Sequence, residues 1–277
     1  MAESETVLDQ DYAAAAQARC QGIRQTIVEM SYSARSAHLG SSLSCVEILD
    51  AMVAASDLRP VTVGSPTRDL IVVSKGHAAM ALYAVLHAWG MIEDRHIAEY
   101  LKDGTALWGH VTRTGAVPAI DFSTGSLGHG LSYATGLALG QRMRGYSSRV
   151  FCLLSDGECD EGAIWEAALL AGHHKLSNLT AVVDYNKIQS IGTTSEVLDL
   201  EPFDAKWSAF RWQPTACNGH DPQALLTNLA RAEGPRVILA DTVKGKGIRR
   251  IENTIASHYR PATEGDRMEF SDARPPN

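Results

Sequence analysis

The sequence lacks the features that mark membrane, secreted and nucleic-acid-binding proteins. No stretch approaches the roughly 18 consecutive apolar residues that a membrane-spanning helix needs. The acidic residues 1–5 do not show the basic and then apolar pattern of a signal peptide. The formal net charge is -7 without long runs of one sign, which argues against nucleic acid or an anionic membrane as a partner. We therefore expect a cytoplasmic protein.

Cysteine is scarce and scattered. The chain has five cysteines, an odd number, and no two of them form a Cys-x-x-Cys pair. They are Cys20, Cys45, Cys152, Cys159 and Cys217. We interpret them as reduced thiols and place Cys152, which lies inside an apolar run, in the core. Internal repeats and low-complexity segments are absent as well.

What the sequence does contain is an alternation of strand-like and helix-like segments. The predicted strands are 69–73, 150–154, 179–183, a segment around 215, and 237–243. The predicted helices are 12–37, 42–53, 76–89, 94–101, 127–142, 164–175 and 222–231. This order predicts an α/β fold with a mostly parallel sheet and helices on both faces.

The length limits the number of domains. A chain of 277 residues holds one large α/β domain, not three domains of ordinary size. We expect this domain to span residues 12–260. Residues 1–11 would then be an N-terminal extension and residues 261–277 a loose polar tail.

Two predicted strands end in residues that suit a metal and a phosphate. One strand stops at Asp156 and Gly157, and the next stops just before Asn186. A strand, helix, strand unit makes the two strands parallel, so these residues should converge at the carboxyl edge of the sheet. A carboxylate and an amide oxygen are suitable ligands for Mg²⁺, and Gly157 allows a phosphate to approach the backbone. Both segments are also ordinary turn sequences, but their register across one crossover favours the metal site.

These segments resemble the thiamine diphosphate motif of transketolases. The motif is carried by residues 156–162, Glu166 and residues 184–188. Other segments similar to the family occur in the family's order, at 37–44, 74–78, 109–110, 124–132 and 242–247. The resemblance covers about residues 12–260, which match the diphosphate-binding domain alone. Transketolases normally add a pyrimidine-binding domain and a smaller C-terminal domain.

The resemblance therefore implies the N-terminal subunit of a split transketolase. Its cofactors would be thiamine diphosphate and Mg²⁺, or another divalent ion such as Ca²⁺ or Mn²⁺. The partner would be a separately encoded, pyrimidine-binding C-terminal subunit, in an α2β2 assembly. The implied reaction moves a two-carbon ketol unit from a ketose to an aldose, with sugar phosphates as substrates. The donor and acceptor sugars stay open, because the family's residues for the far end of the sugar come largely from the domain that this chain lacks.

The resemblance also implies roles for single residues. The implied metal ligands are Asp156, Asn186 and Ile188. The implied cofactor-binding residues are His77, Gly125, Ser126, Leu127, Gly157, Glu161, Asn186, Lys244 and His258. The implied catalytic residues are His38, His77, His110 and His258. Glu161 and Glu166 match glutamates that lie at the family's subunit interface and link the two cofactor sites.

The four catalytic histidines also stand out without the resemblance, because each lies in a loop-like context beside Gly, Ser or Thr. Imidazole can donate a hydrogen bond to an anion or move a proton near neutral pH. We expect ordinary structural or surface roles for His87, His96, His173, His174 and His220. Glu158 and Asp160 are expected to be surface carboxylates.

The sequence departs from the family pattern at several positions. Many transketolases have proline and glutamine where this chain has Ser126 and His129, and Pro-Glu where residues 111–113 follow His110. His258 lacks the usual following glycine. Three alternatives remain: the alpha chain of a 2-oxo-acid dehydrogenase, an enzyme similar to deoxyxylulose phosphate synthase, and a noncatalytic cofactor-binding chain. The segments 74–77, 125–130 and 244–247 favour transketolase over the first of these.

Overall fold

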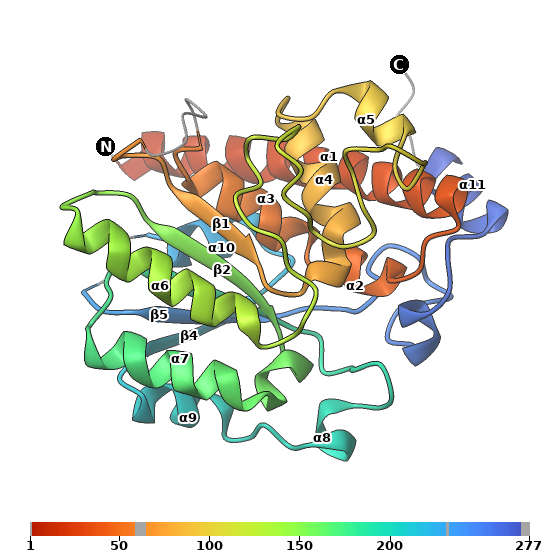
Figure 1. The fold of residues 1–277 in the computed structure, drawn as a ribbon. Coiled ribbons are helices and arrows are strands. Elements are labelled where there is room, and N and C mark those ends of the chain that lie inside the picture. The colour runs from red at the N-terminus through yellow and green to blue at the C-terminus, as the bar shows by residue number, and fades with distance from the viewer. Residues whose placement is uncertain (1, 59–64, 231–232, 273–277) are drawn as a thin grey trace.

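A computed structural model describes residues 2–58, 65–230 and 233–272, with side chains from residue 12 to residue 270. Its centre is a five-stranded sheet of order β1-β2-β3-β5-β4, in which every neighbouring pair is parallel (Figure 1). The strands are β1 (Leu70–Val73), β2 (Val150–Ser155), β3 (Leu179–Tyr185), β4 (Gln213–Asn218) and β5 (Arg236–Asp241). The predicted parallel α/β fold is confirmed.

Helices cover both faces of the sheet (Figure 1). One face carries α1 (Ala2–Ala34), α3 (Val46–Ala55), α4 (Ala79–Ala88) and α10 (Pro222–Asn228). The other face carries α6 (His129–Met143), α7 (Gly162–His173) and α9 (Phe203–Ala209). The remaining short helices are α2 (Leu39–Ser44), α5 (Asp94–Ala98), α8 (Thr194–Val197) and α11 (Glu264–Asp272), with 3₁₀ turns at Gly76–Ala78, Gly157–Asp160 and Ile255–His258.

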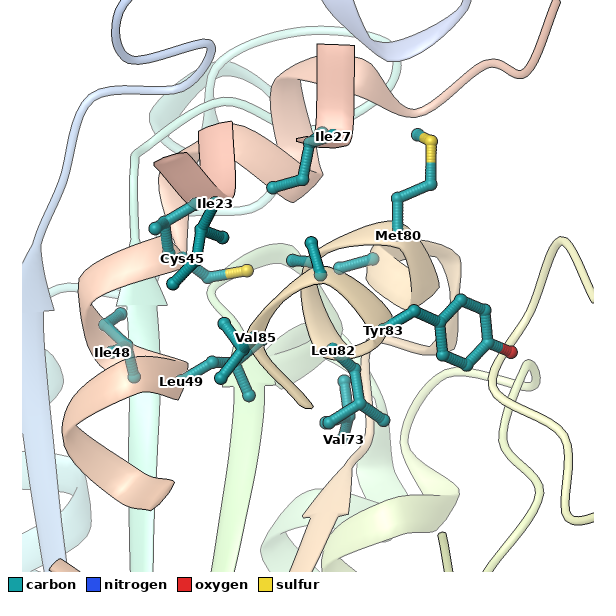
Figure 2. Packing of buried hydrophobic residues seen from close by; sticks show 14 of the residues in the cluster. Ile23, Ile27, Cys45, Ile48, Leu49, Val73, Met80, Leu82, Tyr83 and Val85 are labelled. Carbon is teal, nitrogen blue, oxygen red and sulfur yellow. The ribbon is translucent and has the colours of Figure 1, made fainter. Parts of the chain in front are cut away.

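Each central strand is buried on both faces. In β2, Phe151 and Leu153 pack into the core under α1, α3 and α4, while Cys152 and Leu154 pack into the core under α6 and α7. All four side chains are fully buried, so the run is continuously apolar rather than alternating, as is usual for a covered parallel sheet. The prediction that Cys152 is a core residue is confirmed. Figure 2 shows part of the first core, where Ile23 of α1 lies near α3 and α4.

The expectation of a loose tail is wrong for its described part. Residues 264–272 form α11, which packs along α1. Phe270 is buried in the core, and the buried Asp266 forms an ion pair with Arg250. Phe270, Asp266 and the guanidinium of Arg267, which lies over the ring of Tyr32, join this otherwise polar segment to the domain. At the other end, α1 starts at Ala2, so the expected boundary at residue 12 lies inside a helix.

In the described segments 2–58, 65–230 and 233–272, we find no helix that combines the length and the apolar character required to cross a bilayer.

The topology fixes where a ligand can bind. Because all five strands are parallel, the segments that follow β1, β2, β3 and β5 leave the sheet at one edge. The register pairs Ser155 at the end of β2 with Asp184 in β3, and Asp184 in turn with Ala240 in β5. The predicted motif residues therefore come together at this carboxyl edge.

Candidate functional site

A pocket of about 220 Å³ lies at the carboxyl edge of the sheet. It brings together eleven of the predicted site residues, namely His38, His77, His110, Gly125, Leu127, Asp156, Gly157, Asn186, Ile188, Lys244 and His258. Three predicted residues, Ser126, Glu161 and Glu166, do not line it and are exposed. A larger groove of about 860 Å³ along α1 and α5 contains none of the predicted site residues.

Asp156 lies at the bottom of this pocket as a buried carboxylate. Its Oδ1 accepts a hydrogen bond from the backbone N–H of Gly157 at 2.7 Å, and its Oδ2 accepts one from the N–H of Lys187. Within the described part of the chain it forms no ion pair. Burial, and then the nearby charge of Asp184, raise its pKa to about 7. A cation beside this carboxylate would remove that penalty.

Two further oxygens complete the donor set. The Oδ1 of Asn186 accepts a hydrogen bond from the N–H of Ile188 at 3.2 Å, and the carbonyl of Ile188 accepts one from the Nζ of Lys244 at 2.7 Å. A carboxylate, an amide oxygen and a carbonyl are hard donors that suit Mg²⁺ or Ca²⁺. No cluster of three or more His, Cys, Asp or Glu side chains able to hold a metal occurs among the described residues. A hard cation here would therefore take its other oxygens from a bound phosphate or from water.

Four histidines from separate segments meet above these donors. The ring of His38 lies 5.4 Å from that of His77, 5.7 Å from that of His110 and 5.0 Å from that of His258, between ring centroids. Burial, and then the charge of Lys244, lower the pKa of His258 to about 4. Burial also lowers the pKa values of His77 and His38. These three rings are therefore neutral near pH 7 and can each donate and accept a hydrogen bond.

Two buried lysines also line the pocket. Lys75 follows β1 and Lys244 follows β5, and both are almost fully buried. Burial, and then the charge of Lys75, lower the pKa of Lys244 to about 8. A diphosphate beside Lys244 would favour the charged form of this lysine. The donor set and the lysines together fit a metal ion with a diphosphate.

The turn before α6 is held by a residue whose location we predicted incorrectly. Glu158 was expected at the surface, but it is fully buried. It accepts hydrogen bonds from the hydroxyl of Ser74, from the N–H of Gly128 at 2.8 Å and from the N–H of Ser155 at 3.2 Å. Gly128 has a φ of 85°, which favours glycine. Glu158 therefore fixes the turn that carries Gly125 and Leu127. Asp160 is half-buried and accepts a hydrogen bond from Gln189 at 2.6 Å.

The two predicted interface glutamates lie on an exposed surface. Glu161 precedes α7, and Glu166 is on the outer side of this helix. Leu169 and Leu170 on the same helix are 59% and 46% exposed. This surface is free to contact another chain.

Lys75 and Asp184 are site residues to which the sequence analysis assigned no role. Both are buried, and their side chains form an ion pair. The available signal was their position, since Lys75 comes shortly after β1 and Asp184 lies near the end of β3, each inside a motif that was already noted. His220 is also more than a surface residue, because it joins Glu47 of α3 to the N–H of Val243.

Comparison with known proteins supports the same motif assignment. The family model described as "Transketolase, thiamine diphosphate binding domain" matches residues 15–270. The chain is 40% identical over 232 residues to a 6-deoxy-6-sulfo-D-fructose transketolase subunit of Clostridium sp. (strain MSTE9), covering 82% of this chain and 84% of that protein. It is 36% identical over 244 residues to an apulose-4-phosphate transketolase subunit of Phocaeicola vulgatus, covering 85% of each.

Solved structures agree with these relatives. The crystal structure of transketolase from Campylobacter jejuni matches with a TM-score of 0.82 and 25% identity. The match covers 93% of this chain and 42% of that one. The chain thus spans about two-fifths of the solved transketolase, but most of the length of the two relatives that are named as subunits.

Proposed function

Because the chain belongs to the family of transketolase thiamine diphosphate-binding domains, we propose that it is the N-terminal, diphosphate-binding subunit of a split transketolase. In this role it takes part in the transfer of a two-carbon ketol unit from a ketose to an aldose, with sugar phosphates as the substrate class. The observation that carries the proposal is the pocket at the carboxyl edge. There, hard oxygen donors, buried lysines and neutral histidines face one space. Residues 15–270, which the family model matches, are the proposed cofactor-binding domain.

Different residues of the pocket would bind different parts of the cofactor. Asp156, Asn186 and the carbonyl of Ile188 would hold a divalent ion, Mg²⁺ or a substitute such as Ca²⁺ or Mn²⁺. The diphosphate would be bound by His77, Lys244, His258 and the backbone at Gly157, with Glu161 nearby. Gly125, Ser126 and Leu127 would lie against the thiazolium ring. Thiamine diphosphate, when bound, supplies the nucleophilic carbon and the electron sink that the ketol transfer needs.

The histidines would handle the substrate. His38, His77, His110 and His258 form one cluster, within reach of a single sugar. Neutral imidazoles can donate hydrogen bonds to sugar hydroxyls and move a proton at a hydroxyl during bond cleavage. His110 would act nearest to the reacting carbon.

The partner would supply the pyrimidine end of the site. The two named relatives are transketolase subunits, which supports a separately encoded C-terminal chain for this protein as well. Glu161 and Glu166 would lie in the contact between chains and link the two cofactor sites of an α2β2 assembly. We place this assembly in the cytoplasm.

Coexpression with a pyrimidine-binding chain from a neighbouring reading frame is the direct test. With thiamine diphosphate and Mg²⁺, the pair should transfer ketol units, and neither chain should do so alone. Full activity from this chain alone would overturn the split-subunit proposal. No calorimetric binding of thiamine diphosphate with Mg²⁺, even with the partner present, would favour the noncatalytic alternative. Family membership favours a transketolase over a 2-oxo-acid dehydrogenase or a deoxyxylulose phosphate synthase.

A further inference from the structure

Asp184 joins four segments of the site without lining the pocket itself. Its side chain is completely buried, and it accepts hydrogen bonds from side chains at the end of α2, after β1, after β3 and after β5. These donors are Ser44, Lys75, Asn186 and Thr242. Two of the four, Lys75 and Asn186, line the pocket, and Thr242 lies two residues before Lys244.

Lys75 provides the counter-charge that keeps this carboxylate ionised. The Nζ of Lys75 contacts Asp184 directly and also donates to the carbonyl of Ser41 at 3.1 Å. A carboxylate that is paired with an ammonium group only accepts hydrogen bonds. The four side chains that contact Asp184 all present donors, namely two hydroxyls, the ammonium of Lys75 and an amide NH₂ group. Every group that faces Asp184 must therefore present a donor.

This requirement decides the orientation of Asn186. An amide has a donor end and an acceptor end, and the carboxylate of Asp184 takes the donor end, with Nδ2 3.2 Å from Oδ2. Oδ1 then points the opposite way, toward the N–H of Ile188, in the pocket that also contains Asp156. If the amide were turned over, its NH₂ group would face the cation and its oxygen would face a carboxylate.

We propose that Asp184, with Lys75 as its counter-charge, is a positioning residue that fixes the amide of Asn186 so that its oxygen faces the metal. The inference rests on the metal site proposed above. It assigns a function to Asp184, a buried carboxylate that does not line the pocket. Residues of this kind, which orient a ligand, commonly affect metal affinity about 10–100-fold.

The substitution Asn186→Asp distinguishes a positioning role of Asp184 from an effect of the number of negative charges among the metal donors. A second carboxylate among the donors should strengthen binding of a divalent cation if only the charge matters. If Asp184 positions this residue, the new carboxylate instead faces Asp184 across the contact that Nδ2 makes now. We then expect Mn²⁺ affinity at least about 10-fold below that of the wild type.

The exchange variant Asp184→Asn/Asn186→Asp should recover the loss. It keeps the combined charge of the two positions and again places one donor opposite one acceptor. We expect its Mn²⁺ affinity to return to within about threefold of the wild type. A purely structural role for Asp184 predicts no such recovery, because the exchange also alters the hydrogen bonds to Ser44 and Thr242. Asp160→Asn changes a residue outside the metal-binding oxygens. It is the control, and we expect it to keep the Mn²⁺ affinity of the wild type.

Mn²⁺ binding in the presence of thiamine diphosphate, followed by electron paramagnetic resonance, is the measurement. The wild type is measured alone and with its coexpressed partner, and circular dichroism checks the fold of each variant. Failure of the wild type to bind Mn²⁺ in both forms would overturn the metal site and this inference with it. If the wild type binds, Mn²⁺ affinity in Asn186→Asp at or above that of the wild type overturns the positioning role alone, and so does a folded exchange variant without recovery. If the exchange variant does not fold, the Mn²⁺ affinity of Asn186→Asp alone decides whether Asp184 has the positioning role.

Discussion

Removing the charge of Asp156 should change stability and cofactor binding in opposite directions. The side chain is 1% exposed, and burial and the charge of Asp184 raise its pKa from 3.8 to about 7. Each unit of such a shift corresponds to about 1.4 kcal/mol. The folded, metal-free protein therefore keeps this group ionised at a cost of about 4 kcal/mol. The substitution Asp156→Asn removes this free-energy cost, and it also removes the carboxylate that would coordinate the metal.

The sign of the effect on stability follows from the two pKa values. An unfolded chain ionises this aspartate near pH 4, and the folded, metal-free chain does so only near pH 7. The penalty is therefore absent below about pH 4, grows between about pH 4 and 7, and is constant above. In metal-free buffer, Asp156→Asn should be more stable than the wild type by about 4 kcal/mol at about pH 8. The two proteins should be equally stable near pH 4.

Urea unfolding in the presence of a chelator, at several pH values, measures the stability difference. Calorimetry with thiamine diphosphate and Mg²⁺ measures the loss of binding, which we expect to reach roughly 1,000-fold if the carboxylate contributes about 4 kcal/mol. Asp160→Asn, in the same 3₁₀ turn, is the matched control and should keep the cofactor affinity. The reasoning is refuted if Asp156→Asn binds the cofactor like the wild type, or if its extra stability does not depend on pH.

Three further substitutions test other parts of the molecule. Although Glu47 is buried, its histidine and arginine partners lower its pKa from 4.5 to about 2. Glu47→Gln should therefore cost about 3 kcal/mol at neutral pH, and equal urea midpoints would contradict this. The difference should shrink between about pH 4.5 and pH 2, because the unfolded wild-type chain takes up a proton on Glu47 in this range while the folded chain keeps the carboxylate ionised. His110→Ala should lower turnover more than thiamine diphosphate affinity, as kinetics and calorimetry can show, and the reverse pattern would mean that His110 binds the cofactor instead. Glu158→Ala leaves the N–H of Gly128 without its acceptor and should cost about 3 kcal/mol in urea unfolding, whereas the exposed Glu166→Ala should cost almost nothing; similar losses in both would contradict the buried role.

The strands that were easiest to predict are those covered on both faces. Residues 150–154 are continuously apolar, and residues 179–183 are apolar except for Thr180, because both sides of β2 and β3 pack under helices. The edge strand β4 is only half-buried, so its sequence indicated a strand around residue 215 without clear ends. Helix α9 was not predicted, since it has only seven residues and its burial depends on Phe203 and Trp207 meeting the aromatic residues of other elements.

The site could be located from sequence, but its buried charges could not. Asp156 and Asn186 follow adjacent parallel strands, which is a local pattern. Charged side chains are normally exposed, so nothing local indicates that Glu158 or Lys75 is buried. Their burial depends on partners far away in the sequence: 84 residues separate Ser74 from Glu158, and 109 residues separate Lys75 from Asp184.

The pKa shifts in the pocket indicate which charges on a bound ligand would stabilise its ionisable groups. Lys244 and His258 have lowered pKa values, and Asp156 has a raised one. Burial is the first cause of all three shifts, so an opposite charge bound beside each group would favour its charged form. A diphosphate alone would stabilise the charged forms of Lys244 and His258 but would add negative charge near Asp156, and a metal ion alone would do the opposite. Only a metal ion and a polyanion bound together satisfy both sides, because each then also neutralises the other.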